Sequence, residues 1–246
     1  AWSALTLQQG VTFSSSTLQY CTAGDARQSI IDNFGWSITD AGLATGCSSS
    51  DELTPITDSN FHAAITNCLN TNPQDGMCSE SEYGAMPNWD VSNVTDMSNA
   101  FRFKMNFNAD ISAWDVSSVT DFGGMFYEAR AFNQDISNWN VSNATSMADM
   151  FNNARVFNQD ISVWNVSNVT HMNGMFNQNY TFNIDLSAWD VSNVTNMAAM
   201  FRYASAFNQN LSSWNISNVN DLNDFGHGSL ISCLLYTSDA ADEVSW

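Results

Sequence analysis

The sequence is poor in basic residues. Its 246 residues include six Lys and Arg, with Lys104 as the single lysine, against 25 Asp and Glu, so the formal net charge is −19 at pH 7. An anionic surface of this size repels phosphate backbones, so we expect no nucleic-acid partner. The charge suits solubility in a salty medium, or the binding of divalent cations.

Long apolar runs are also missing. None approaches the roughly 18 residues that a membrane-spanning helix needs, so we expect no membrane-spanning segment in this chain. The chain opens at Ala1 with neither an initiator Met nor a signal peptide. We therefore expect a fragment or a mature segment whose export signal or anchor lies outside this sequence.

Cysteines are few, at Cys21, Cys47, Cys68, Cys78 and Cys233. Two plausible local disulfides, Cys21–Cys47 and Cys68–Cys78, fit an oxidising, extracellular setting. The sequence alone does not fix this connectivity, and Cys233 is left without an expected partner.

The sequence shows no catalytic set. His62, His171 and His227 share no phase of the repeat described below, and there is no nucleophile motif or glycine-rich phosphate loop. Paired carboxylates could serve a glycosidase, but acids recur throughout and no pair stands out. We therefore expect neither an enzyme nor a cofactor.

What the sequence does contain is a 25-residue repeat marked by a tryptophan. The markers are Trp89, Trp114, Trp139, Trp164, Trp189 and Trp214. Repeats of this length are typical of solenoids, in which each unit buries its apolar side by stacking on its neighbours.

Other positions of the repeat are equally regular. Two phenylalanine columns consist of Phe101, Phe126, Phe151, Phe176 and Phe201, and of Phe107, Phe132, Phe157, Phe182 and Phe207. An asparagine column runs from Asn108 to Asn208, followed by an acidic column. We expect the Phe and Met columns to form the core and the Asn column to form a ladder of side-chain amides.

The spacing inside one unit predicts its local structure. Met147, Met150, Phe151 and Ala154 fall at i, i+3, i+4 and i+7, which predicts a short helix with Thr145 as its N-cap. The later apolar positions are more widely and irregularly spaced, which predicts a short strand over residues 160–162 and a corner at the tryptophan.

Together these features predict the fold class. We expect an α/β solenoid, a right-handed coil of the leucine-rich-repeat size class with 25-residue repeats. Each repeat would contain a short strand and a short helix, and capping segments would flank the array.

The unit MFxxAxxFNQDISxWxVSNVT resembles the BspA-like surface-protein repeat, a divergent relative of the leucine-rich repeat. Residues 151–154 (FNNA) and 157–162 (FNQDIS) carry the resemblance, which covers residues 87 to about 224. It implies a secreted or cell-surface protein that adheres to, or binds, extracellular protein or glycan. The alternative we retain is a structural subunit of an extracellular fibre or matrix that associates with itself.

Four segments follow from these patterns. Residues 1–46 resemble a segment that closes such arrays, so we expect the C-terminal cap of a preceding array. Residues 47–86 are expected to form a linker and an N-terminal capping helix, with Asp58 or Ser59 as the N-cap of that helix. Residues 87–228 form about five and a half repeats.

The last segment, residues 229–246, breaks every column. Its stretch CLLYTSDAADE can be back-translated into a sequence that resembles a transposase adapter used in sequencing libraries. We therefore expect this tail to be non-native, with a genuine C-terminal tail as the alternative.

The acidic column is the candidate metal site. Its carboxylates could bind Ca²⁺ on successive coils. The alternative is that each Asp caps a turn, a role in which Asn210 would serve equally well. The column consists of Asp110, Asp135, Asp160 and Asp185.

Two further sets of residues are candidates for function. Asn93, Asn143, Asn168 and Asn193 begin N-x-S/T sequons that could carry glycans in a eukaryotic secretory pathway, or that arise by chance in a Ser/Thr/Asn-rich repeat. Five of the six basic residues follow the first Phe column by one to four positions: Arg102, Lys104, Arg130, Arg155 and Arg202. We expect them to line one edge, paired with acids of neighbouring coils.

Overall fold

The computed structural model describes residues 12–14, 37–39 and 53–231, in two compact units, Ala1–Thr54 and Pro55–Trp246. In the first unit, β1 (Thr12–Ser14) pairs with β2 (Ser37–Thr39) in parallel, Phe13 opposite Ile38. The predicted Cys21–Cys47 pair and residues 232–246 lie outside the described residues, and the predicted segment boundaries remain predictions.

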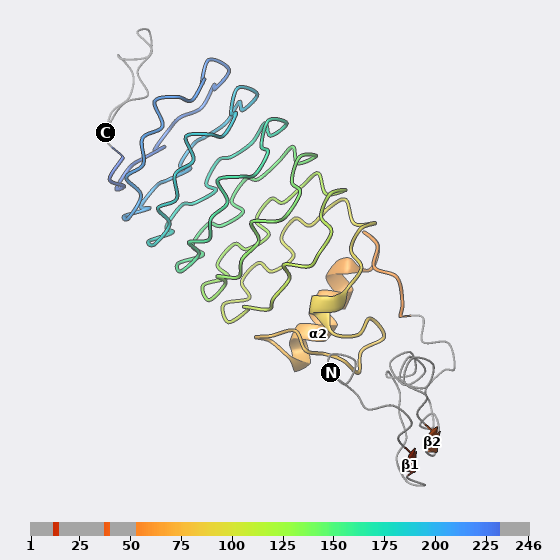
Figure 1. Ribbon diagram of the computed structural model, residues 1–246. Helices are drawn as coiled ribbons and strands as arrows, with labels where there is room; N and C mark the ends of the chain where they lie inside the picture. Colours follow the sequence, from red (N-terminus) through yellow and green to blue (C-terminus); the bar gives the residue numbers. More distant parts are fainter. Residues whose placement is uncertain (1–11, 15–36, 40–52, 232–246) are drawn as a thin grey trace. The chain divides into compact units, whose positions relative to one another are not determined.

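The second unit contains a stack of coils (Figure 1). We count each coil from one tryptophan to the next, 25 residues later. It begins with the helix α2 (Phe61–Thr71) and the short 3-10 helix η2 (Met86–Asn88). Parallel bridges then join residues 25 apart at the seventh position after each tryptophan: Asp96, Asp121, Ser146, His171, Asn196 and Asp221. Within the described ranges, no helix is long and apolar enough to cross a membrane.

The expected α/β solenoid of strand–helix repeats is wrong, because the described coils contain neither helix nor strand. In the segment predicted as a helix, residues 145–154, Asp149 and Asn153 have φ of 55°, which a right-handed helix excludes. Equivalent residues of the other coils also have positive φ. The segment is therefore a run of tight turns.

The hydrogen bonds explain why turns replace the helix. Alternate N–H groups donate within the coil to the residue three back, as Met150 does to Met147 (3.2 Å). The intervening N–H groups donate to the next coil: Met147 to His171 (2.9 Å), Asp149 to Asn173 (2.8 Å), Phe151 to Met175 (2.9 Å) and Asn153 to Asn177 (2.7 Å). A helix directs its N–H groups along its own axis and could not donate to a neighbouring coil.

The strand expected over residues 160–162 is also absent. There the Asp160 carboxylate accepts from the N–H (3.0 Å) and hydroxyl (2.7 Å) of Ser162, and Trp164 N–H donates to Ile161 C=O (3.1 Å). This segment is a turn. The Asn column is likewise not an amide-to-amide ladder, because Asn133 Oδ1 accepts from the backbone N–H of Asn158 (3.0 Å).

The core is aromatic, as the Phe columns predicted, and all ten column residues are fully buried. Within a coil the two rings stack at 3.9 Å, as Phe151 does on Phe157. Between coils Phe126 and Phe151 stack at 5.5 Å. Indole nitrogens also join coils, since Trp164 Nε1 donates to Ile136 C=O (3.2 Å). Each coil thus completes its core through contacts with its neighbours.

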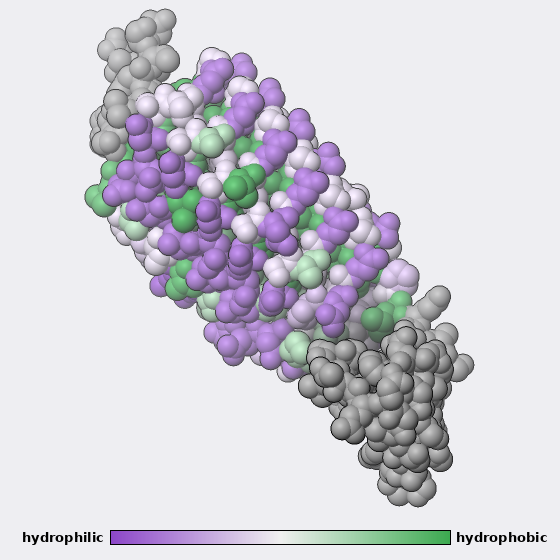
Figure 2. All heavy atoms as spheres, viewed as in Figure 1, coloured by the Kyte–Doolittle hydropathy of each residue, from purple (hydrophilic) through white to green (hydrophobic). Residues whose placement is uncertain are grey.

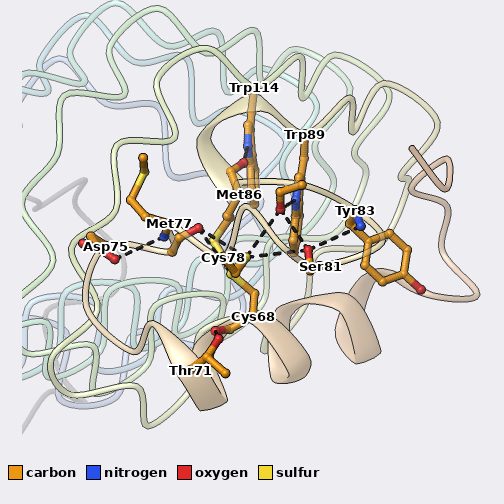
Figure 3. Close-up of a disulfide and its surroundings, with 12 residues drawn as sticks. Cys68, Thr71, Asp75, Met77, Cys78, Ser81, Tyr83, Met86, Trp89 and Trp114 are labelled. Carbon is orange, nitrogen blue, oxygen red and sulfur yellow. Dashed lines mark hydrogen bonds between the residues drawn. A yellow bond between two sulfur atoms is a disulfide. The ribbon is translucent and has the colours of Figure 1, made fainter. Parts of the chain in front are cut away.

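A cap closes the first coil. Phe61, Ala64 and Ile65 of α2 are buried, and the Cys68–Cys78 disulfide joins α2 to the turn before the coils (Figure 3). Trp89 and Trp114 stack above this turn with ring centres 6.2 Å apart.

Asp58 is not the N-cap of α2, which is Asn60. Its carboxylate accepts instead from Thr95 N–H (2.7 Å), Thr95 Oγ1 (2.7 Å) and Asp96 N–H (3.2 Å). In the next coil Thr120 donates its N–H to Thr95 C=O (2.8 Å). Asp58 therefore supplies the acceptor that a preceding coil would otherwise supply.

Candidate functional site

The acidic column lies at exposed corners of the coils. Each carboxylate accepts from the backbone N–H of the serine two residues later, at 3.1 Å for Asp110, 2.9 Å for Asp135, 3.0 Å for Asp160 and 2.9 Å for Asp185. Asn210 does the same at 3.0 Å. The hydrogen bonds from Ser112 hold the pKa of Asp110 below its ordinary value.

These contacts fit the turn-capping alternative for the acidic column. Among the described residues, no three His, Cys, Asp or Glu side chains converge as a metal site. The calcium hypothesis gains no geometric support, and one carboxylate oxygen of each column residue, Oδ1, already accepts a hydrogen bond from the turn that it caps.

The sequons differ in their surroundings. In Asn143, Asn168 and Asn193, the amide nitrogen that would carry a glycan donates to a carbonyl of the preceding coil at 2.7–2.8 Å. Asn93, in the first coil, is exposed. Asn179 also begins a sequon but is 0% exposed, so the folded protein hides it. Whether any of these residues is modified stays a prediction.

The predicted basic edge contains more than basic residues. The residues at positions 13 to 17 after each tryptophan lie between the two Phe columns in the sequence, and in this segment neighbouring coils are in contact. We call the basic, aromatic and large apolar residues at these positions the aromatic–arginine edge; one acid, Glu128, lies among them. The edge consists of Arg102, Phe103, Lys104, Met105, Tyr127, Arg130, Arg155, Val156, Tyr180, Arg202 and Tyr203.

Cations and rings alternate along this edge. The Arg102 guanidinium lies 4.9 Å from the ring centre of Phe103 and 4.6 Å from that of Tyr127 in the next coil. Phe103 and Tyr127 meet edge to face at 5.4 Å. Arg155 approaches Tyr180 of the next coil at 5.7 Å. The stacking therefore brings together residues that are 25 positions apart in sequence.

Two of the basic residues form ion pairs with acids, but the expected pairing with an acid of a neighbouring coil holds only for Arg202. Arg130 pairs with Glu128 at 2.7 Å within its own coil, and Arg202 pairs with Asp224 of the next coil at 3.3 Å. Arg102 and Arg155 form no ion pair with a described residue and donate to the amide oxygens of Asn99 (3.0 Å) and Asn153 (2.8 Å). No carboxylate in the described part of the chain therefore lies within ion-pair distance of either guanidinium.

The edge also gathers apolar surface. Nine large hydrophobic side chains are exposed in the described part of the chain, and five of them lie here: Phe103, Met105, Val156, Tyr180 and Tyr203. Figure 2 shows a mostly hydrophilic face with isolated hydrophobic residues. Sequence reasoning missed these aromatic residues because they occupy positions 13, 14 and 16 in different coils and form no column.

The positive φ of the coil turns positions the edge. Phe103 and Tyr203 have φ of 60° and 56°, and their N–H groups donate to the next coil at 2.8 Å and 2.7 Å. Such a conformation is unfavourable for an aromatic residue and persists where surrounding contacts hold it. Hydrogen bonds to the next coil therefore hold the backbone beneath these rings.

Comparison with known proteins assigns the repeat region to a family. No curated protein and no solved structure matches the chain. One family model matches residues 75–170 and again 137–229, which together cover more than half of the chain. The chain therefore belongs to the family described as "Mycoplasma protein of unknown function, DUF285".

Proposed function

We propose that the coil stack is a binding module of a secreted or cell-surface protein, and that it binds an extracellular protein or glycan through the aromatic–arginine edge. One observation carries this proposal: exposed rings gather on one edge of a chain with net charge −19, beside Arg102 and Arg155, which have no acidic partner among the described residues.

The composition of the edge supports recognition. Tyr, Phe, Met and Arg are enriched at protein interfaces, where Tyr and Arg often contribute most of the binding energy. A patch of exposed apolar side chains that is bordered by polar residues is typical of a binding surface.

The rigidity of the edge supports it further. Residues at positions 10, 12 and 14 donate backbone hydrogen bonds to the next coil, and the Phe stacks lie beneath them. Fixed backbone reduces the conformational entropy that is lost on binding.

Two arguments support the proposed extracellular or cell-surface location of the protein. The Cys68–Cys78 disulfide joins the cap to the coils, and disulfides of this kind persist in oxidising compartments. The resemblance to BspA-like surface repeats points the same way, towards adhesion or extracellular binding.

The test is a binding panel with the purified chain. Wild-type protein is applied to immobilised extracellular-matrix proteins and glycans, beside a triple variant, F103S/Y180S/Y203S. Because these side chains are 54%, 40% and 38% exposed, their loss should leave the fold intact. The matched control is V163S, whose side chain is 73% exposed at a different position of the coil.

We expect at least one panel member to bind wild type and V163S equally, and the triple variant at least tenfold more weakly. Absence of binding to every member, or equal binding by all three proteins, would overturn the proposal. Sedimentation of the wild type covers the alternative function: self-association at micromolar concentration that the triple variant abolishes would favour a fibre or matrix subunit.

A further inference from the structure

We infer that the ligand of the aromatic–arginine edge is an acidic polysaccharide, a linear chain of sugars bearing carboxylate or sulfate groups, laid along the axis of the coil stack. This inference rests on the proposed function and narrows its partner class.

The sign of charge on the edge is the first reason. The edge holds five of the six basic residues of a chain whose net charge is −19. Arg102 and Arg155 form no ion pair with a described residue. An anionic ligand is therefore attracted here and repelled by the acidic surface around it, and charge complementarity of this kind sets orientation and specificity.

The rings are the second reason. Phe103 and Tyr180 keep about half of their surface exposed, and sugar rings pack their C–H faces against aromatic rings. Side chains at neighbouring positions add amides that can donate to hydroxyl groups, among them Gln178, which is partly exposed. A charged sugar unit offers an acidic group to the cation, a C–H face to the aromatic ring and hydroxyl groups to the amide, so this combination of side chains matches it.

The repeat is the third reason. Coils that share bridges lie about 4.8 Å apart, and each of five successive coils contributes a cation or an aromatic ring to the edge. A linear polymer with about one charge per sugar or sugar pair matches this spacing. Double-stranded DNA carries one charge per about 1.7 Å and would meet far stronger repulsion from the acidic remainder of the chain.

The experiment is calorimetric titration of the full chain with hyaluronate, which carries carboxylates, and with heparin, which carries sulfates, at low and at physiological salt. Dextran serves as the neutral polysaccharide. The test variant is R102Q/R155Q, which lowers the net charge by two. The control N93D/S118D lowers the net charge equally, at exposed residues four positions after the tryptophans.

We expect wild type to bind at least one polyanion more tightly at low salt, R102Q/R155Q to bind at least tenfold more weakly, and N93D/S118D to lose less than threefold. R102K/R155K keeps the charge without the planar fork and should fall between them. Urea midpoints confirm that each variant is folded.

Three results would overturn the inference: binding of neither polyanion, equal loss in the two charge-matched variants, or equal affinity for dextran. The proposed function is tested separately, because an edge-dependent protein or neutral-glycan ligand in the binding panel would preserve it while the acidic-polysaccharide inference fails.

Discussion

At the scale of single residues, the coils turn through short Asp and Asn side chains. Each accepts the N–H two residues ahead, at the first, seventh and twenty-first positions after the tryptophan, as Asp115, Asp121 and Asp135 do. Such side chains mimic a backbone turn. The Asp-to-Asn interchange at Asn210 shows that the acceptor oxygen, rather than its charge, is what the corner requires.

The first prediction concerns this acceptor. D110A removes the group that receives Ser112 N–H and hydroxyl, and should lower the free energy of unfolding by about 1 kcal/mol. D110N keeps an acceptor there and should lose clearly less. Urea unfolding of the three proteins at pH 7 measures both differences, and equal losses in D110A and D110N would contradict the capping role.

The pH dependence of the same residue gives a second prediction. The Ser112 hydrogen bonds lower the pKa of Asp110 in the folded protein. Its ionised form therefore adds stability that is fully present above the unfolded pKa of about 4, and that is lost as the pH falls through the lower folded value. The stability advantage of wild type over D110N should shrink below about pH 4. An advantage that grows on acidification would contradict this assignment.

At the scale of elements, the tight turns of residues 145–154 and their equivalents replace the expected helix. The backbone angle φ at the tenth position after each tryptophan distinguishes these turns from a helix most clearly. It has positive φ in every coil, with Gly174 at 65° and Ala199 at 54°.

This geometry predicts the sign of a stability change. A199G should raise the free energy of unfolding by about 1 kcal/mol, because an L-residue with a Cβ is strained at positive φ. G174A should lower it, since φ is positive there and a Cβ would meet the Asp149 carboxylate. Urea unfolding measures both. If the segment were a helix, A199G would instead cost about 1 kcal/mol.

The comparison of sequence with structure is clearest in these segments. The buried Phe columns were predictable because a constant phase over five coils demands a shared environment. The helix was mispredicted because apolar residues at i, i+3, i+4 and i+7 also line one side of this run of turns. The signal that could have corrected it was the tenth position, where Asn99, Gly124, Asp149, Gly174 and Asp224 are residue types that tolerate positive φ.

The aromatic–arginine edge was predictable only in part, to the extent that it follows from the spacing of residues within one repeat. The basic residues could be assigned to one edge from their distance to the Phe column. The pairing of Arg102 with Tyr127 depends on the register between coils, and the exposure of Phe103 depends on its turn. Neither follows from the spacing of residues within one repeat.

At the scale of the whole molecule, the second unit depends on contacts between neighbouring coils, and its register is 25 residues throughout. Deleting residues 146–170 joins Thr145 to His171 and removes one complete coil in phase. The shortened protein should still unfold cooperatively, with a lower midpoint and a smaller urea dependence, because stability in stacked repeats is roughly a sum over neighbours.

The control for this prediction deletes residues 146–157, about half a coil. It shifts Phe and Trp positions out of phase and should abolish cooperative unfolding. If the two deletions had the same effect on unfolding, the 25-residue register would not be what stabilises the stacked coils.

The register itself can be measured most directly by cross-linking. Ser146 and His171 are bridge partners on neighbouring coils, and a separation of about 4.8 Å lies within the range that a disulfide spans. With Cys21, Cys47 and Cys233 replaced by serine, S146C/H171C should form an intramolecular disulfide under mild oxidation, whereas S146C/N196C, two coils apart, should not. Failure of the first pair, or efficient cross-linking of the second, would contradict the stacked coils on which the core, the cap and the aromatic–arginine edge all depend.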